Sequence, residues 1–124
     1  MKFKEFSFVA YATTDVPRAR AFYEGVLGLK PINVWESPES AFIEYEVGPN
    51  TLAIGKGAPN FKPGKLGATV ALEVDDIDAA LKELTEKNVK FLMKSYDGPV
   101  CTMFLIEDPD LNQIMIHKRK EKKA

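Results

Sequence analysis

A strand followed at once by a helix opens the chain, and the same pattern returns 61 residues later. Residues 6–29 (FSFVAYATTDVPRARAFYEGVLGL) start with aromatic, β-branched and small residues, which favour a strand, and continue with apolar residues at helical spacing. Asp15 stands at the expected N-cap and Pro17 in the first turn, where a missing N–H does no harm. The offset of 61 aligns Asp15 with Asp76, ahead of a second apolar helical pattern. The repeat therefore predicts two copies of one structural unit.

Three shorter extended segments follow each expected helix, separated by turns rich in Gly, Pro and Asp. In the first half we expect strands at residues 31–36, 41–47 and 51–55. In the second half we expect a strand at residues 69–74, a helix from Asp76 to near Asn88, and strands at residues 91–95, 100–107 and 113–118. The order β-α-β-β-β thus occurs twice. One such unit leaves a sheet edge unpaired, so a second unit is expected to complete it.

The predicted fold class is α+β, with two βαβββ modules that form curved mixed sheets around a concave cavity and carry their helices on the outer face. A chain of 124 residues has the length of a single domain. We expect the first module over residues 1–57, a linker over residues 58–65, the second module over residues 66–118 and a basic tail over residues 119–124.

Composition excludes several functional classes. The chain has no long apolar run and no signal-peptide pattern at its start, so we expect a cytoplasmic protein without a membrane partner. Cys101 is the single cysteine and cannot form an internal disulfide, which agrees with a reducing compartment. Residues 118–124 (KRKEKKA) carry five basic residues and one acidic residue. No aromatic residues accompany them, so we expect a solvated end and no nucleic-acid partner.

Alternation along the strands predicts which side chains face the helix and which face the cavity. Apolar positions of one parity are expected to pack against the helix, and their alternates to line the concave surface. The residues expected to bind a ligand there are Phe6, Phe8, Trp35, Phe42, Glu44, Glu46, Thr69, Glu73, Tyr96, Gln113, Met115 and His117. Their aromatic rings would stack on a planar ligand, and their carboxylates would attract a cationic one.

Several of these residues also have simpler interpretations. The aromatic residues would serve equally in the core, and Glu44 and Glu46 would be solubilising charges if their strand is an exposed edge. His117 is a candidate general base or hydrogen-bond donor, or else a strand-end histidine half in solvent. For Cys101 we favour a small buried hydrophobe over a nucleophile, because nothing in the sequence requires a base beside it.

Two further motifs stand near opposite ends of the chain. Residues 22–29 (FYEGVLGL) follow the N-cap Asp15, and residues 107–110 (EDPD) precede the last expected strand. Together they resemble the vicinal oxygen chelate superfamily, which includes glyoxalase I, extradiol dioxygenases and bleomycin-resistance proteins. The resemblance extends over residues 6–117 and implies the fold described above.

In the metalloenzymes of that superfamily, the ligands come from the first, fourth, fifth and eighth strands. The positions that the resemblance assigns to these ligands hold Phe8, Ala53, Thr69 and Met115. Only Thr69 offers an oxygen atom, and it is a weak ligand, so no metal and no other cofactor is predicted. The arginine that grips glutathione in glyoxalase I would be Ala12 here. The only histidine, His117, cannot supply the triad of two histidines and one carboxylate that dioxygenases use.

These inferences favour a metal-independent member of the superfamily that binds a small organic molecule, such as a cationic or aromatic antibiotic, as a homodimer. The alternative is an enzyme. It would be a glyoxalase-like lyase with displaced metal ligands among Glu44, Glu46, Glu73 and His117, or a metal-free isomerase with a carboxylate base. Its catalytic candidates are His117 and Glu73. A third interpretation is a subunit or regulator whose concave surface contacts another protein.

Overall fold

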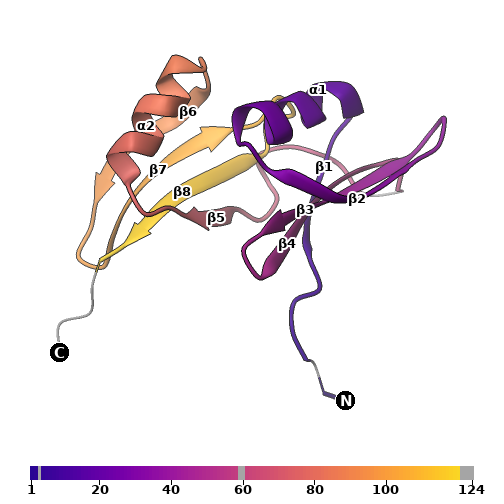
Figure 1. The fold of residues 1–124 in the computed structure, drawn as a ribbon, viewed down its shortest axis with the longest axis horizontal. Helices are drawn as coiled ribbons and strands as arrows, with labels where there is room; N and C mark the ends of the chain where they lie inside the picture. Colours follow the sequence, from indigo (N-terminus) through magenta and orange to yellow (C-terminus); the bar gives the residue numbers. More distant parts are fainter. Residues whose placement is uncertain (3, 59–60, 121–124) are drawn as a thin grey trace. The chain divides into compact units, whose positions relative to one another are not determined.

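The computed structural model describes residues 1–2, 4–58 and 61–120 (Figure 1). It divides into two compact units, Met1–Pro63 and Gly64–Ala124, and the boundary falls inside the expected linker of residues 58–65. Residues 121–124 of the expected basic tail lie outside the described residues. No helix within the described ranges is long and apolar enough to cross a membrane.

The first unit, coloured indigo to magenta in Figure 1, combines one helical region with a four-stranded sheet. Its elements are β1 (Val9–Ala12), α1 (Val16–Arg20), a π-helical segment η1 (Ala21–Val26), β2 (Lys30–Glu36), β3 (Ala41–Val47) and β4 (Asn50–Lys56). The strand order is β1-β4-β3-β2, with β1 parallel to β4 and the other pairs antiparallel. As predicted, Asp15 caps the helix, because its carboxylate accepts a hydrogen bond from Arg18 N at 3.1 Å.

The second unit repeats this topology. Its elements are β5 (Val70–Glu73), α2 (Ile77–Glu86), β6 (Lys90–Asp97), β7 (Cys101–Glu107) and β8 (Gln113–Arg119). The strand order is β5-β8-β7-β6, and α2 lies across one face of this sheet in Figure 1. Asp76 caps α2 by accepting a hydrogen bond from Ala79 N at 3.0 Å. The predicted α+β class, with two βαβββ modules and curved mixed sheets, is therefore confirmed.

In the first unit, the core joins the helical region to one face of the sheet. Tyr23 and Tyr45 are fully buried, and their rings stack with centroids 5.9 Å apart. Ile43 and Ile54 share this face and are also buried. The predicted alternation along β3 is thus present, with 43 and 45 toward the helix and 42, 44 and 46 on the other face.

Two features of the first strand and helix differ from the prediction. The strand begins at Val9 rather than at Phe6, because β1 pairs only with the four positions of β4 from Leu52 to Gly55. The helix changes to π geometry after Arg20, and Leu27 N donates to Phe22 O, five residues back, at 2.9 Å. Gly28, at φ 71°, ends it as predicted.

The second core is built from one parity of β7 and β8. Phe104, Ile106, Ile114 and Ile116 are buried, together with Leu84 of α2. The prediction that Cys101 is buried was wrong. The residue opens β7 opposite Arg119, near the end of the ladder, and remains partly exposed.

Candidate functional site

Each sheet has a face that points away from its own helix. The first free face is formed by Ala10, Ala12, Asn33, Trp35, Phe42, Glu44, Glu46, Thr51, Ala53 and Gly55. The second free face is formed by Thr69, Ala71, Glu73, Met93, Tyr96, Met103, Leu105, Gln113, Met115 and His117. Because the two faces belong to different units, each is described separately.

On the first free face, aromatic side chains lie beside small residues. The strand register places Ala12, Gly55, Phe42 and Trp35 in one row across the sheet. A Cβ atom at Gly55 would lie 3.2 Å from the ring of Phe42 and 3.2 Å from the ring of Phe61. The Phe8 ring meets Phe42 edge to face, with centroids 5.2 Å apart. Trp35 is 58% exposed, so its indole is open to a ligand.

The neighbouring row of the first free face carries an oriented carboxylate. It contains Ala10, Ala53, Glu44 and Asn33. Asn33 Nδ2 donates a hydrogen bond to Glu44 Oε1 at 3.0 Å, which directs this acid across the face. Glu46 lies two residues further along β3 and is exposed. Since β3 is enclosed between β4 and β2, the interpretation of these acids as charges on an edge strand is wrong.

On the second free face, a histidine and a glutamate are joined by a short hydrogen bond. His117 Nδ1 lies 2.6 Å from Glu73 Oε1, and Glu73 Oε2 accepts a hydrogen bond from Arg119 N at 2.7 Å. The hydrogen bond to His117, followed by the one from the Arg119 amide, lowers the pKa of the Glu73 carboxyl. The His117 side chain is only 19% exposed, so it is more enclosed than the alternative of a histidine half in solvent implied.

The strand register arranges the second free face in three rows. The first contains Glu73, His117, Met103 and Tyr96. The second is apolar and contains Ala71, Met115, Leu105 and Met93. Beyond it, Gln113 Nε2 donates a hydrogen bond to Thr69 Oγ1 at 3.2 Å. An apolar strip therefore runs between two polar edges, which suits a small amphipathic molecule.

Two of the residues predicted to bind a ligand lie in positions that are less suited to ligand binding. Phe6 precedes β1 and is 92% exposed, so it does not join the other aromatic residues of the first free face. Tyr96 lies at the edge strand β6, where its ring occupies the space beside Gly98, and a Cβ atom at that glycine would be 2.6 Å from the ring.

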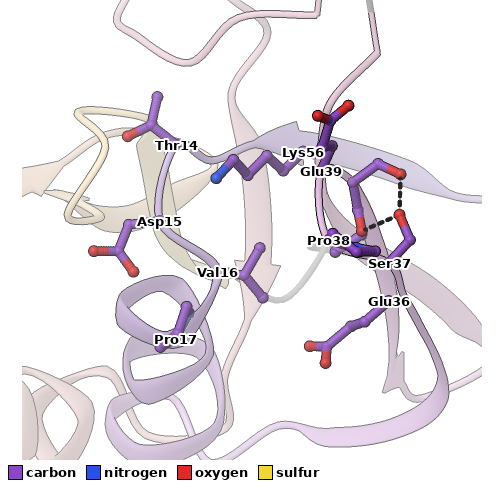
Figure 2. A pocket seen from close by; sticks show the side chains of 11 residues that line it. Thr14, Asp15, Val16, Pro17, Glu36, Ser37, Pro38, Glu39 and Lys56 are labelled. Carbon is purple, nitrogen blue, oxygen red and sulfur yellow. Dashed lines mark hydrogen bonds between the residues drawn. The ribbon is translucent and has the colours of Figure 1, made fainter.

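A cavity of about 470 Å³ opens elsewhere in the first unit, where α1 begins (Figure 2). It is lined by residues 14–17, residues 36–41 and Lys56. Several of its polar groups already have partners within the chain. Asp15 caps the helix, and Glu36 lies 3.6 Å from Arg20. The hydroxyls of Ser37 and Ser40 lie 2.8 Å apart, and dashed lines join these two residues in Figure 2. We therefore place the candidate site on the free faces and not in this cavity.

Residues 5–116 match the family model named Glyoxalase, which describes the Glyoxalase/Bleomycin resistance protein/Dioxygenase superfamily. The chain belongs to this superfamily. It is 28% identical over 120 residues to the lactoylglutathione lyase of Haemophilus influenzae, with 89% of each chain covered. It is 29% identical over 119 residues to the lactoylglutathione lyase of Salmonella typhimurium, covering 86% of this chain and 87% of the relative.

Solved structures share the fold of this chain. TnmS3, an antibiotic binding protein from Streptomyces sp. CB03234, gives a TM-score of 0.83 at 20% identity and covers 97% of this chain and 99% of its own. A glyoxalase/bleomycin resistance protein from the same organism gives a TM-score of 0.75 at 22% identity, covering 88% of this chain and 96% of its own. At these identities the likeness establishes the glyoxalase fold alone.

The four residues that the resemblance assigns to metal-ligand positions have other surroundings in the structure. Phe8 contributes its ring to the aromatic cluster, and Ala53 is fully buried. The Thr69 hydroxyl accepts the amide of Gln113, while Met115 lies in the apolar row. Within the described part of either unit, no three His, Cys, Asp or Glu side chains come together in an arrangement that could hold a metal ion.

Sequence reasoning missed several residues of these faces. Asn33 reaches the first free face because an irregularity in β2 between Pro31 and Asn33 shifts the register, and alternation alone does not reveal such a shift. Met103 and Leu105 were not assigned to a face. They alternate with Phe104 and Ile106, so both parities of β7 are apolar and periodicity carries no signal there.

Proposed function

We propose that this protein binds a small organic molecule on the free faces of its sheets and needs no metal to do so. The observation that supports this proposal most strongly is the aromatic surface of the first unit. Phe8 meets Phe42 edge to face, and Phe42 and Phe61 crowd Gly55. Phe8 and Ala53 are also the residues that the resemblance assigns to two metal-ligand positions. These residues supply stacking area and no electron-pair donors, so the face is suited to binding a planar organic group.

The charge of the first free face favours a cationic or neutral aromatic ligand. Glu44 is held by Asn33 in the row beside Trp35 and Phe42. A cation stacked on these rings would gain both from the carboxylate and from the negative π faces. Glu46 adds a second acid on the same strand.

The relatives give partial support to this proposal. TnmS3, which shares the fold, is described as an antibiotic binding protein. The curated relatives are lactoylglutathione lyases, but the position that the resemblance assigns to their glutathione-gripping arginine is Ala12, which is buried. Binding therefore explains this chain better than that lyase reaction does. A cytoplasmic homodimer without a nucleic-acid partner is part of the same proposal.

Trp35 is the only tryptophan in the chain, so its fluorescence reports directly on the first free face. We would titrate the protein with acridine orange, a planar cation, and compare tetrabutylammonium and anthracene sulfonate. The expected result is quenching of Trp35 and a raised Tm with the planar cation, and weaker effects with the other two. Bleomycin-like, glutathione-conjugate and catechol compounds would extend the thermal-shift screen.

Two variants and one metal analysis complete this test. Glu44→Gln should weaken cation binding several-fold, because it removes a facing charge and keeps the shape. Glu83→Gln, on the outer surface of α2, is the matched control and should leave binding unchanged. Purified protein should carry no stoichiometric metal. One tightly bound equivalent of nickel, zinc or manganese per chain would overturn the proposal, as would equal cation affinity in Glu44→Gln and the wild type.

A further inference from the structure

The Glu73 and His117 side chains form the one feature of the second free face that simple ligand stacking does not explain. They come from strands β5 and β8, which pair in parallel with Glu73 directly opposite His117. Both oxygens of Glu73 are engaged, one by the imidazole at 2.6 Å and the other by the Arg119 amide at 2.7 Å. The carboxylate is therefore fixed in position, and it fixes one nitrogen of the imidazole.

This arrangement determines which imidazole nitrogen carries the proton. A carboxylate can only accept a hydrogen bond, so neutral His117 must hold its proton on Nδ1. Nε2 is then left with its lone pair and can accept a proton. Both side chains keep access to solvent, at 19% exposure for His117 and 49% for Glu73, and the apolar row of Met115 and Leu105 lies beside them.

We propose that Glu73 and His117 form a general-base dyad, in which His117 Nε2 removes a proton from a weakly acidic C–H or O–H group of a molecule lying on the apolar row. His117 is the catalytic residue, and Glu73 is a positioning residue that sets the tautomer. The position of neither residue coincides with a metal-ligand position of the superfamily. This proposal rests on one part of the proposed function, namely that a ligand binds to the second free face. The Trp35 experiment tests binding to the first free face.

The simplest reaction that this dyad could perform is an isomerisation next to a carbonyl group. Nε2 takes the proton from the carbon beside the carbonyl, and the electron pair of the C–H bond moves into an enolate. After the enolate has turned over, return of that proton to the other face of the same carbon regenerates the carbonyl group and neutral His117, and the carbon is epimerised. Proton and electron pair are both conserved, so no oxidant, reductant or second substrate is needed.

The tautomer can be observed directly because the chain contains one histidine. In a two-dimensional ¹⁵N–¹H spectrum of the uniformly labelled protein, neutral His117 should show the Nδ1–H tautomer. Glu73→Ala should shift it toward the Nε2–H form, and Glu83→Ala should not change it. An Nε2–H tautomer in the wild-type protein would overturn the proposal, because the base would then be blocked.

The reactivity test uses nitrobenzisoxazole, an apolar aromatic carbon acid. A general base removes its ring C–H proton, the N–O bond breaks, and the coloured cyanonitrophenolate is released, so the reaction balances without a co-reactant. We expect His117→Gln to lower kcat/KM at least about tenfold, consistent with the usual contribution of a general base. Glu73→Ala should lower kcat several-fold with little change in KM, and Glu83→Ala should match the wild type.

Two comparisons keep this result interpretable. His117→Gln and Glu73→Ala must retain the wild-type circular dichroism spectrum. Wild-type turnover in His117→Gln would overturn the dyad. Quenching of Trp35 by aromatic cations would persist in that case, so failure of the dyad and failure of the binding proposal are distinguishable.

Discussion

Tyr45 on β3 donates its phenolic hydrogen to Glu24 Oε2, 2.9 Å away in the π-helical segment. Arg20 holds the same carboxylate through its Nε at 2.6 Å, and it also lies 3.6 Å from Glu36 of β2. This chain of contacts ties the helical region to two strands of the first sheet. Burial, followed by the hydrogen bond to Glu24, raises the pKa of the Tyr45 phenol, so its hydrogen remains available at all physiological pH values.

Removing that hydroxyl should weaken the first unit. Tyr45→Phe keeps the ring stacked on Tyr23 but loses a hydrogen bond to a charged group, which is worth about 1.5–3 kcal/mol. Because Arg20 still pairs with Glu24, we expect a loss at the lower end, about 1.5 kcal/mol in the free energy of unfolding. Urea denaturation measures it. Tyr96→Phe, half exposed on the other unit, should change stability by less than about 0.5 kcal/mol. Equal effects of the two substitutions would contradict this account.

The same carboxylate should make stability depend on pH. The hydrogen bond from Arg20, with a further one from Tyr45, lowers the pKa of Glu24 in the folded chain below its unfolded value of about 4.3. The charged form is thus favoured by folding, and its contribution is fully present above that value and is lost as the pH falls through the lower, folded pKa. We expect the stability difference between wild type and Glu24→Gln to be constant from pH 7 to about 5 and to shrink below pH 4. A difference that grows on acidification would refute the assignment.

Much of the fold could be predicted because its signals are local. The caps Asp15 and Asp76, the C-terminal Gly28 and the alternating strand from Ala41 to Val47 each act on their immediate neighbours. The 61-residue repeat then supplied the topology. The features that the sequence did not reveal depend on contacts between residues that are far apart in the chain. The start of β1 follows from the extent of its pairing with β4, and no local pattern encodes it.

The candidate site was less predictable for the same physical reason. Alternation placed Glu73 and His117 on one face, but their 2.6 Å contact depends on the parallel register between strands that are 44 residues apart. The orientation of Glu44 likewise depends on an irregularity in the neighbouring strand. Residue type and strand alternation thus predicted which residues share a face of the sheet. The pairing register between the strands determined which of their side chains are in contact.

Gly55→Ala should disturb the first free face without unfolding the unit. The new Cβ atom would lie 3.2 Å from the rings of Phe42 and Phe61, so these rings must move by a few tenths of an ångström. We expect the affinity for a planar aromatic cation to fall at least about threefold, with a stability cost near 1 kcal/mol. Trp35 quenching and urea denaturation measure the two quantities. Gly67→Ala, whose Cβ atom would meet open space, is the control, and the same loss of affinity there would contradict the explanation.

The EDPD motif is explained by the Asp108 carboxylate, which organises the turn between β7 and β8. Its Oδ1 accepts hydrogen bonds from Asp110 N at 2.8 Å and Asn112 N at 2.9 Å. Its Oδ2 accepts from Asn112 Nδ2 at 2.8 Å, and the Asn112 oxygen in turn accepts from Gly64 N at 3.0 Å. These hydrogen bonds connect Gly64, the first residue of the second unit, to the turn between β7 and β8. This motif therefore supports the fold and not the reaction.

Asp108→Ala should accordingly be among the most damaging single substitutions in the second unit. It leaves two buried amide hydrogens without their acceptor, each costing about 1–3 kcal/mol, so we expect a loss of roughly 3 kcal/mol or more. Asp108→Asn should cost less, because one carbonyl oxygen can still accept from both amides. Asp97→Ala is the matched control, since its exposed ion pair with Lys120 is worth less than about 1 kcal/mol. Urea denaturation orders the three variants, and a loss in Asp97→Ala as large as that in Asp108→Ala would show that the turn is not held by this carboxylate.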